Sequence, residues 1–188
     1  MDAKDNGAYG KSLNRRDRGE SPPGSPRKAE NLQIRLAGSR DAAIITDILH
    51  AAFLEYKPRY TDGGFAATAP GPQKIRARMR EGPIWIALCA RKAVGTVAAV
   101  RKGKAVYLRG MAVLPSARGS STGLRLLQQV EQWTAAAGAR RLFLSTTPFL
   151  HAAIRLYERS GFVRIDQGPK DLFGTPLFTM EKVLSPPE

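Results

Sequence analysis

The chain has 188 residues, which is enough for one domain with a substantial hydrophobic core. Its content of 43% hydrophobic and 24% charged residues is typical of a globular protein and excludes a wholly disordered or fibrous chain. No apolar stretch approaches the roughly 18 residues of a membrane span, and residues 1–6 lack the apolar core of a signal peptide. We therefore expect a soluble, cytoplasmic protein.

The formal net charge is +14. Residues 1–30 hold seven basic and five acidic side chains, so most of the excess positive charge lies on the rest of the chain. A basic surface suits nucleic acid, but it suits a small polyanion such as a nucleotide cofactor equally well. Because residues 1–31 carry almost no large apolar side chains, we expect a disordered basic tail there, a folded domain over residues 32–184, and a loose C-terminus at residues 185–188.

The residues with metal-binding or redox chemistry are few. Cys89 is the only cysteine and lies in an apolar run, so the sequence excludes an internal disulfide and favours a buried thiol. His50 and His151 are the only histidines and match no metal-ligand spacing. No Gly-x-x-x-x-Gly-Lys-Ser/Thr loop for a nucleoside triphosphate is present.

The hydrophobic pattern predicts alternating strands and helices, and hence an α/β or α+β domain with a mixed sheet. The expected strands are residues 34–36, 84–90, 93–101, 105–114, 141–146, 162–165 and 177–183. The expected helices follow the apolar periodicity at residues 44–53, 73–80, 126–137 and 152–157.

Several local signals refine this pattern. Ser39 is the expected N-cap of the first helix, and Arg91 with Lys92 is the expected turn between two strands. Residues 55–72 are rich in glycine, proline and threonine, so we expect a loop there. Gly110, inside a strand, indicates a bulge or a close backbone approach.

Residues 113–124 follow the order of a strand, a loop of small residues and the start of a helix. The unpaired backbone N–H groups at a helix start, together with the helix dipole, bind phosphate. Small side chains let a phosphate reach that backbone, and Arg118 adds a positive charge beside it. The segment predicts a pyrophosphate site, with an ordinary flexible helix start as the alternative.

Two motifs then give a specific resemblance. The run Arg118-Gly119-Ser120-Ser121-Thr122-Gly123 resembles the Arg/Gln-x-x-Gly-x-Gly/Ala coenzyme A loop of the GNAT acetyltransferases. Residues 153–162, Ala-Ile-Arg-Leu-Tyr-Glu-Arg-Ser-Gly-Phe, match that family's Ala-Ile-x-Leu-Tyr-x-x-x-Gly-Phe segment. The resemblance covers about residues 32–184 and implies a mixed, mostly antiparallel central sheet flanked by helices.

The resemblance also implies an activity and a site. Members transfer an acetyl group from acetyl-coenzyme A, the acyl-donor cosubstrate, to a primary amine in a ternary complex. By resemblance Tyr157 is the general acid that protonates the departing thiolate, with a core aromatic as the alternative reading. The implied cofactor-binding residues are the pantetheine edge Met111, Ala112 and Val113 and the pyrophosphate loop Arg118, Gly119, Ser120, Ser121, Thr122 and Gly123.

Two positions depart from the family pattern. Ser121 stands where the middle glycine is usual; because serine is small and can donate a hydrogen bond, we expect phosphate binding to survive in weakened form. Leu150 stands where many members carry a cofactor-contacting asparagine, so we leave it out of the site.

The sequence does not identify a general base. Many relatives place a glutamate where this chain has Tyr107, which is a poor base at neutral pH. The acids Glu55, Asp62, Glu81 and Asp166 are candidates, although each reads equally well as a solvated surface charge. A neutral acceptor amine or a chain of water molecules would make a dedicated base unnecessary.

Other functions remain open at this point. A non-catalytic acyl-coenzyme A sensor would keep the phosphate loop without needing Tyr157. A nucleic-acid-binding protein would use a basic patch built from Lys92, Arg101, Lys102 and Lys104. The Gly-x-Ser-x-Gly string at residues 119–123 is not a hydrolase nucleophile elbow, because residues 115–118 separate it from the strand. We expect a small-molecule or peptide amine as acceptor, with its pocket covered by residues 55–72, and no membrane partner. A homodimer is compatible with the sequence.

Overall fold

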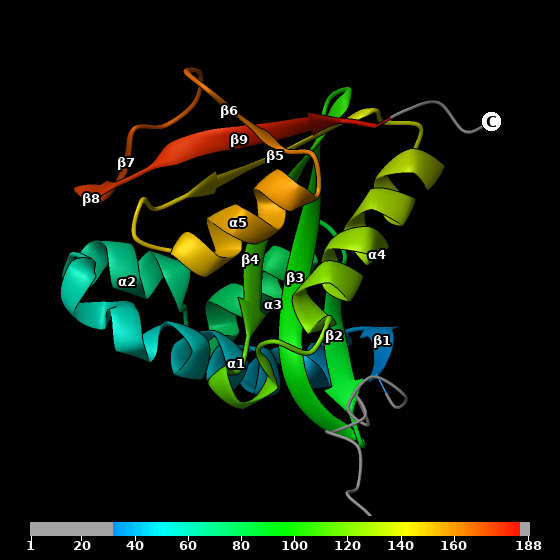
Figure 1. Ribbon diagram of the computed structural model, residues 1–188. Coiled ribbons are helices and arrows are strands. Elements are labelled where there is room, and N and C mark those ends of the chain that lie inside the picture. Colours follow the sequence, from blue (N-terminus) through cyan, green and yellow to red (C-terminus); the bar gives the residue numbers. More distant parts are fainter. Residues whose placement is uncertain (1–31, 185–188) are drawn as a thin grey trace, which may run out of the picture.

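The computed structural model describes residues 32–184, so the expectations for residues 1–31 and 185–188 lie outside the described part. Its main feature is a seven-stranded sheet in the order β1-β2-β3-β4-β5-β9-β6 (Figure 1). All neighbouring strands are antiparallel except β4 and β5, which run parallel. The strands are β1 (Leu32–Leu36), β2 (Ile84–Cys89), β3 (Lys92–Lys102), β4 (Ala105–Val113), β5 (Arg141–Thr146), β6 (Val163–Ile165) and β9 (Phe178–Val183). This confirms the expected mixed, mostly antiparallel sheet.

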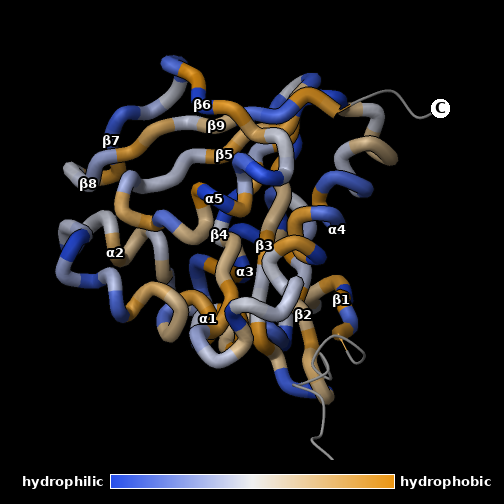
Figure 2. Tube along the Cα trace, viewed as in Figure 1, coloured by the Kyte–Doolittle hydropathy of each residue, from blue (hydrophilic) through white to orange (hydrophobic). Residues whose placement is uncertain are grey.

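Helices cover both faces of the sheet and create two hydrophobic clusters. Helices α4 (Thr122–Ala136) and α5 (His151–Arg159) pack on one face, where Leu126, Leu127 and Tyr157 are buried. Helices α1 (Ala42–Phe53) and α3 (Pro72–Met79) pack on the other. In Figure 2 the hydrophobic segments run along α1 and the central strands, while hydrophilic segments occupy outer turns. Burying each large aliphatic side chain stabilises the fold by roughly 1.5–3 kcal/mol before the ordering entropy is subtracted.

The bulge expected at Gly110 is confirmed. Thr96 of β3 pairs with Ala112 of β4, yet Ala98 pairs with Arg109, so β4 has one residue more than β3 across this interval. Gly110 absorbs the extra residue with φ of 58°, a left-handed conformation that costs glycine little. The bulge bends β4 midway along its length.

Strands β4 and β5 stop pairing after Tyr107, shortly before the bulge. Their parallel pairing is limited to Ala105–Arg141, Val106–Leu142 and Tyr107–Phe143. Beyond Tyr107, β4 pairs only with β3 on its other side, and β5 pairs with β9. We call the opening between residues 108–113 and residues 144–147 the β4–β5 wedge.

Two local expectations need correction. The N-cap is not Ser39: a single 3₁₀ turn (Ser39–Asp41) precedes α1, and the Asp41 carboxylate accepts a hydrogen bond from the Gly38 backbone at 2.7 Å. The Arg35 guanidinium that binds the same carboxylate lowers the pKa of Asp41 to about 2. The β2–β3 turn lies one residue earlier than expected, at Ala90 and Arg91, whose φ values of 47° and 66° suit a two-residue hairpin.

The loop expected at residues 55–72 is largely helical. It contains the 3₁₀ segment η2 (Leu54–Arg59) and helix α2 (Asp62–Thr68), and α3 begins at Pro72. The Thr61 hydroxyl caps α2 by accepting a hydrogen bond from the Gly64 backbone at 3.0 Å. The glycines of residues 55–72 led us to expect a loop, but Gly64 lies inside α2, where its missing side chain allows close packing against residues near Thr175.

Thr175 belongs to a small hairpin that the sequence did not predict, formed by β7 (Asp171–Leu172) and β8 (Thr175–Pro176). The Thr61 hydroxyl donates to the Phe173 carbonyl at 2.7 Å, and the Thr61 backbone donates to the Thr175 hydroxyl at 3.0 Å. A Cβ on Gly64 would lie 2.2 Å from the Thr175 hydroxyl. Tertiary packing therefore overrides the poor helix propensity of this glycine.

Within residues 32–184, no helix combines the length and apolarity needed to cross a membrane.

We predict that Gly64→Ala lowers the free energy of unfolding by about 1–3 kcal/mol, because the new methyl group overpacks the contact between α2 and β8. Gly71→Ala is the control: its added methyl group meets nothing within 4 Å, so only the smaller cost of alanine at the N-cap of α3, below about 1 kcal/mol, should remain. Urea unfolding of both variants measures the difference. Equal stabilities for the two variants would contradict the close packing of α2.

Candidate active site

The β4–β5 wedge opens into a cavity of about 810 Å³. Helix α5 and the start of α4 line one side, while α1, η2, α2 and α3 contribute residues on the other. All ten residues expected in the site line this cavity: Met111, Ala112, Val113, Arg118, Gly119, Ser120, Ser121, Thr122, Gly123 and Tyr157. The structure thus brings both sequence motifs, residues 118–123 and residues 153–162, to one cavity.

The backbone of β4 is exposed to the wedge from residue 108 onward. Ala112 and Val113 pair with Thr96 and Gly95 of β3, so only one edge of β4 is used by the sheet. The other edge has no strand partner, since its pairing with β5 ends at Tyr107. An unpaired edge offers N–H and C=O groups to an extended ligand.

The loop before α4 has a left-handed residue at the helix start. Ser121, the N-cap, has φ of 31° and ψ of −3°, a conformation that favours glycine. This gives the physical reason for a glycine at this position and shows that serine imposes backbone strain as well as a changed side chain. The Ser120 hydroxyl is directed inward, donating to the Ala117 carbonyl at 2.5 Å.

The next residues tie the loop to the helices. Thr122 is buried and its hydroxyl lies 3.0 Å from that of Ser120. A Cβ on Gly123 would lie 3.0 Å from Leu156 in α5, so the glycine allows α4 and α5 to approach at the cavity. Four backbone N–H groups at the start of such a helix lack intrahelical acceptors and can bind an anion.

Arg118 is held by partners on the opposite side of the cavity. Its guanidinium forms an ion pair with Glu55 and donates to the Ala52 carbonyl at 3.0 Å. It also lies 5.9 Å from the centre of the Tyr56 ring. An anion bound at the loop therefore has to compete with Glu55 for this guanidinium.

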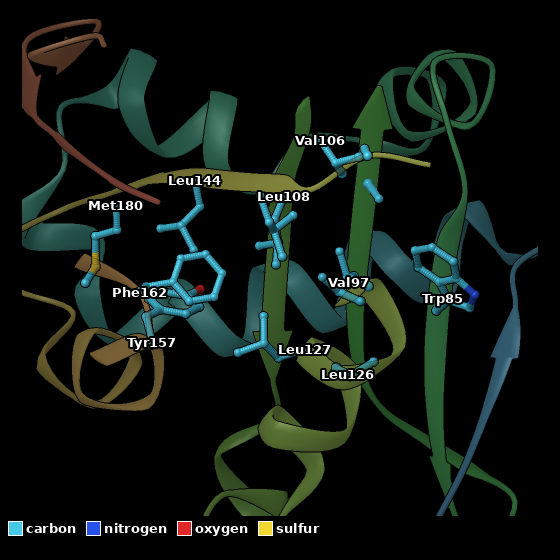
Figure 3. Close-up of a cluster of buried hydrophobic side chains, with 14 of the residues drawn as sticks. Trp85, Val97, Val106, Leu108, Leu126, Leu127, Leu144, Tyr157, Phe162 and Met180 are labelled. Carbon is cyan, nitrogen blue, oxygen red and sulfur yellow. The ribbon is translucent and has the colours of Figure 1, made fainter. Parts of the chain in front are cut away.

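Tyr157 lies on the inner face of α5. Its side chain is 5% exposed, and its ring centre is 5.7 Å from that of Phe162. Figure 3 shows the ring within the hydrophobic cluster beside Phe162 and Leu144. Burial, with a smaller contribution from Tyr107, raises the pKa of Tyr157 above its usual value, so the phenol keeps its proton throughout the neutral range.

None of the acids considered as a general base lines the cavity. Glu55 and Glu81 are ion-paired with Arg118 and Arg109, and Asp62 and Asp166 are not part of the lining. Both histidines are exposed and lie outside the lining: His50 is in the last turn of α1, and His151 begins α5. Tyr107 does line the cavity, in ring contact with Phe143 at 5.2 Å.

The structure adds lining residues that the sequence did not indicate. Tyr60 comes from the segment expected to be a loop, and burial raises the pKa of its phenol. Leu150, which we did not expect in the site, is part of the lining. No motif marks Arg78 or Arg109, and the alternation along β4 does not single out Arg109, because Leu108 beside it also lines the cavity.

The basic residues suggested as a nucleic-acid patch do not form one. Lys92 begins β3, whereas Arg101, Lys102 and Lys104 lie at its other end, about 30 Å away along an extended strand. Arg101 also donates hydrogen bonds to the carbonyls of Gly103 and Ala137.

We predict that Ser121→Gly raises the free energy of unfolding by up to about 1 kcal/mol, because glycine relieves the left-handed strain at the start of α4. Ser116→Gly, at an exposed 3₁₀ position without positive φ, should instead lower it. Denaturant unfolding checks both. A loss of stability in Ser121→Gly as large as that in Ser116→Gly would refute the strain.

Comparison with known proteins gives a consistent result. Residues 45–162 match the model of the Acetyltransferase (GNAT) family. An IAA acetyltransferase of Azospirillum brasilense is 38% identical over 92 residues, which are 48% of this chain and 59% of that protein. The chain thus matches about three-fifths of the length of this curated relative.

Solved structures share the fold at low sequence identity. The PaiA N-acetyltransferase of Thermoplasma acidophilum, solved with coenzyme A, has a TM-score of 0.70 and 15% identity, over 81% of this chain and 99% of that one. The yncA protein of Salmonella typhimurium, solved with acetyl-CoA, has a TM-score of 0.65 and 21% identity, over 83% and 95%. With the family match spanning more than half of its length, this chain belongs to the acetyltransferase (GNAT) family.

Proposed function

We propose that the chain is an N-acetyltransferase that moves an acetyl group from acetyl-CoA to a primary amine by direct attack in a ternary complex. The observation that carries the proposal is the β4–β5 wedge, an open cavity that holds an unpaired strand edge, a phosphate-type helix start and Tyr157 together. Family membership and the relatives solved with coenzyme A or acetyl-CoA support the choice of cosubstrate.

The residues of the cavity suit this cosubstrate. Met111, Ala112 and Val113 would hold the pantetheine amides through their unpaired backbone groups, as an added strand does. The loop from Arg118 to Gly123 would hold the pyrophosphate at the start of α4. The charged residues among the lining are all arginines, which is the charge that a polyphosphate ligand requires.

The bound cosubstrate supplies a thioester, an acyl group already activated for attack by an amine. The backbone N–H groups beside the Gly110 bulge are the donors available to polarise its carbonyl. The Tyr157 phenol keeps its proton at rest because burial raises its pKa. It donates that proton to the sulfur as negative charge develops there.

Proton removal from the amine uses no carboxylate of the lining, which contains neither aspartate nor glutamate among the described residues. The acceptor therefore enters as the neutral amine or passes its proton to water, with the Tyr107 hydroxyl as a hydrogen-bond partner in the cavity.

We predict that Tyr157→Phe lowers kcat about 100-fold or more while changing acetyl-CoA affinity less than threefold, because it removes only the proton donor. Thiol release measures turnover, calorimetry measures affinity, and unchanged thermal melting controls for packing. Equal losses of turnover and affinity would make Tyr157 a packing residue. Binding of acetyl-CoA without turnover of any amine by the wild type would favour the non-catalytic acyl-CoA sensor instead.

We also predict that Glu55→Gln tightens acetyl-CoA binding about twofold to fivefold, since it frees Arg118 from an exposed ion pair. Asp62→Asn is the control, because it removes one exposed acid of the same region that makes no ion pair with Arg118. Calorimetric titration of both variants gives the comparison. If both changes have the same effect, general electrostatics rather than release of Arg118 accounts for it.

A further inference from the structure

Two guanidinium groups line the cavity away from the pyrophosphate loop. Arg109 lies on β4 just before the Gly110 bulge, and Arg78 lies near the end of α3. Nη1 of Arg109 is 2.9 Å from a Glu81 carboxylate oxygen, and Nη2 of Arg78 donates to the Ala67 carbonyl at 2.8 Å. Three further nitrogens, Nε of Arg78 and both Nε and Nη2 of Arg109, have almost no exposed surface and no hydrogen-bond partner among the described residues.

Unsatisfied buried donors on charged groups are costly, which makes these three atoms unusual. Burial, and then the charge of Arg109, lowers the pKa of Arg78, as expected where positive charge is poorly compensated. A small cavity that touches both arginines has a volume of about 10 Å³, at the lower limit for one water molecule. One water accepts two hydrogen bonds at most, so at least one donor still needs an acceptor.

The charges around the cavity indicate which kind of chemical group supplies the missing hydrogen-bond acceptor. Arg78, Arg109, Arg118 and Arg159 line it, and no acid of the described residues does. Glu81, the single acid paired with this group, is exposed and reaches only one nitrogen of Arg109. A polycationic substrate such as a polyamine or a lysine-rich peptide would be repelled, because the described lining offers arginines and no carboxylate.

The geometry of Arg109 narrows the choice further. Nε and Nη2 are the two donors on one edge of a guanidinium, and they point in parallel. This edge matches the two oxygens of a carboxylate in a bidentate pair. Arg109 precedes Met111, the expected pantetheine contact, by two residues, so an acceptor anchored there lies next to the acyl-transfer position.

We propose that the acceptor is a small amine carrying a carboxylate, of the size of a free amino acid, with the carboxylate bound by Arg109 and Arg78. This inference rests on the proposed acetyltransferase function. Because these donors have almost no exposed surface in the structure, binding turns the Arg109 edge toward the cavity, where the carboxylate satisfies it. The amine at the other end of the molecule then faces the thioester.

The test compares the twenty L-amino acids with their C-terminal amides as acceptors for the full chain at saturating acetyl-CoA, followed by thiol release. Amidation lowers the pKa of the neighbouring amine and so favours the neutral nucleophile; chemistry alone makes the amides better acceptors. We expect the reverse, with kcat/KM at least tenfold higher for the accepted acids than for their amides. Amides equal to or faster than the acids, or no accepted acid although acetyl-CoA binds, would overturn the inference.

Variants locate the contact. Arg109→Lys keeps the charge near Glu81 but loses the edge of two donors, and it should lower kcat/KM for acids about tenfold to a hundredfold while changing amides less than threefold. Arg76→Gln, at a position of α3 outside the cavity lining, is the control and should change neither. Acetyl-CoA titration of the wild type and of each variant separates the two claims. If the wild type does not bind acetyl-CoA, the proposed function is wrong. If all of them bind it but Arg109→Lys lowers kcat/KM equally for acids and amides, only the carboxylate contact is wrong.

Discussion

The site depends on the point where β4 and β5 stop pairing. Three residue pairs, ending at Tyr107 and Phe143, hold the parallel strands together before the Gly110 bulge bends β4 away. The separation leaves backbone groups without partners inside the domain, a costly arrangement unless a ligand or water uses them. It also places the start of α4 and the inner face of α5 on one cavity. The separation of β4 from β5 thus brings together the free edge of β4, the loop before α4 and the Tyr157 phenol. The two hydrophobic clusters on the faces of the sheet offset the free-energy cost of this irregularity.

The charged residues of the cavity are spread over several of its walls. All charged residues of the described lining are arginines: Arg118 in the loop before α4, Arg109 and Arg78 beside the bulge, and Arg159 at the end of α5. Arg118 has partners in Glu55 and the Ala52 carbonyl, so its charge is partly compensated before any ligand binds. Arg118 thus links the loop to the opposite wall of the cavity. Arg109 and Arg78 keep buried donors that an anionic substrate would satisfy and a cationic substrate would not.

The sequence predicted the parts of the fold that local pattern encodes. Apolar periodicity located the main strands and helices, glycine inside a strand located the bulge, and two motifs located ten of the lining residues. It failed where distant residues decide the outcome. Helix α2 forms because Gly64 packs against Thr175, more than one hundred residues away. For Ser121 the sequence reveals only a changed side chain, whereas the backbone conformation is the stronger constraint. Arg78 was not predicted because nothing near it in sequence signals a cavity.

The most direct test of the central claim is a crystal structure of the full chain grown with acetyl-CoA. We expect an extended pantetheine arm in the β4–β5 wedge, hydrogen-bonded to the backbone of Met111 and Val113, with the pyrophosphate at residues 118–123 and the sulfur near the Tyr157 hydroxyl. Acetyl-CoA bound elsewhere, or a wedge that stays empty at millimolar acetyl-CoA, would contradict this placement. Either contradicting result would mean that the chain keeps the fold of its family without using this cavity for the cofactor.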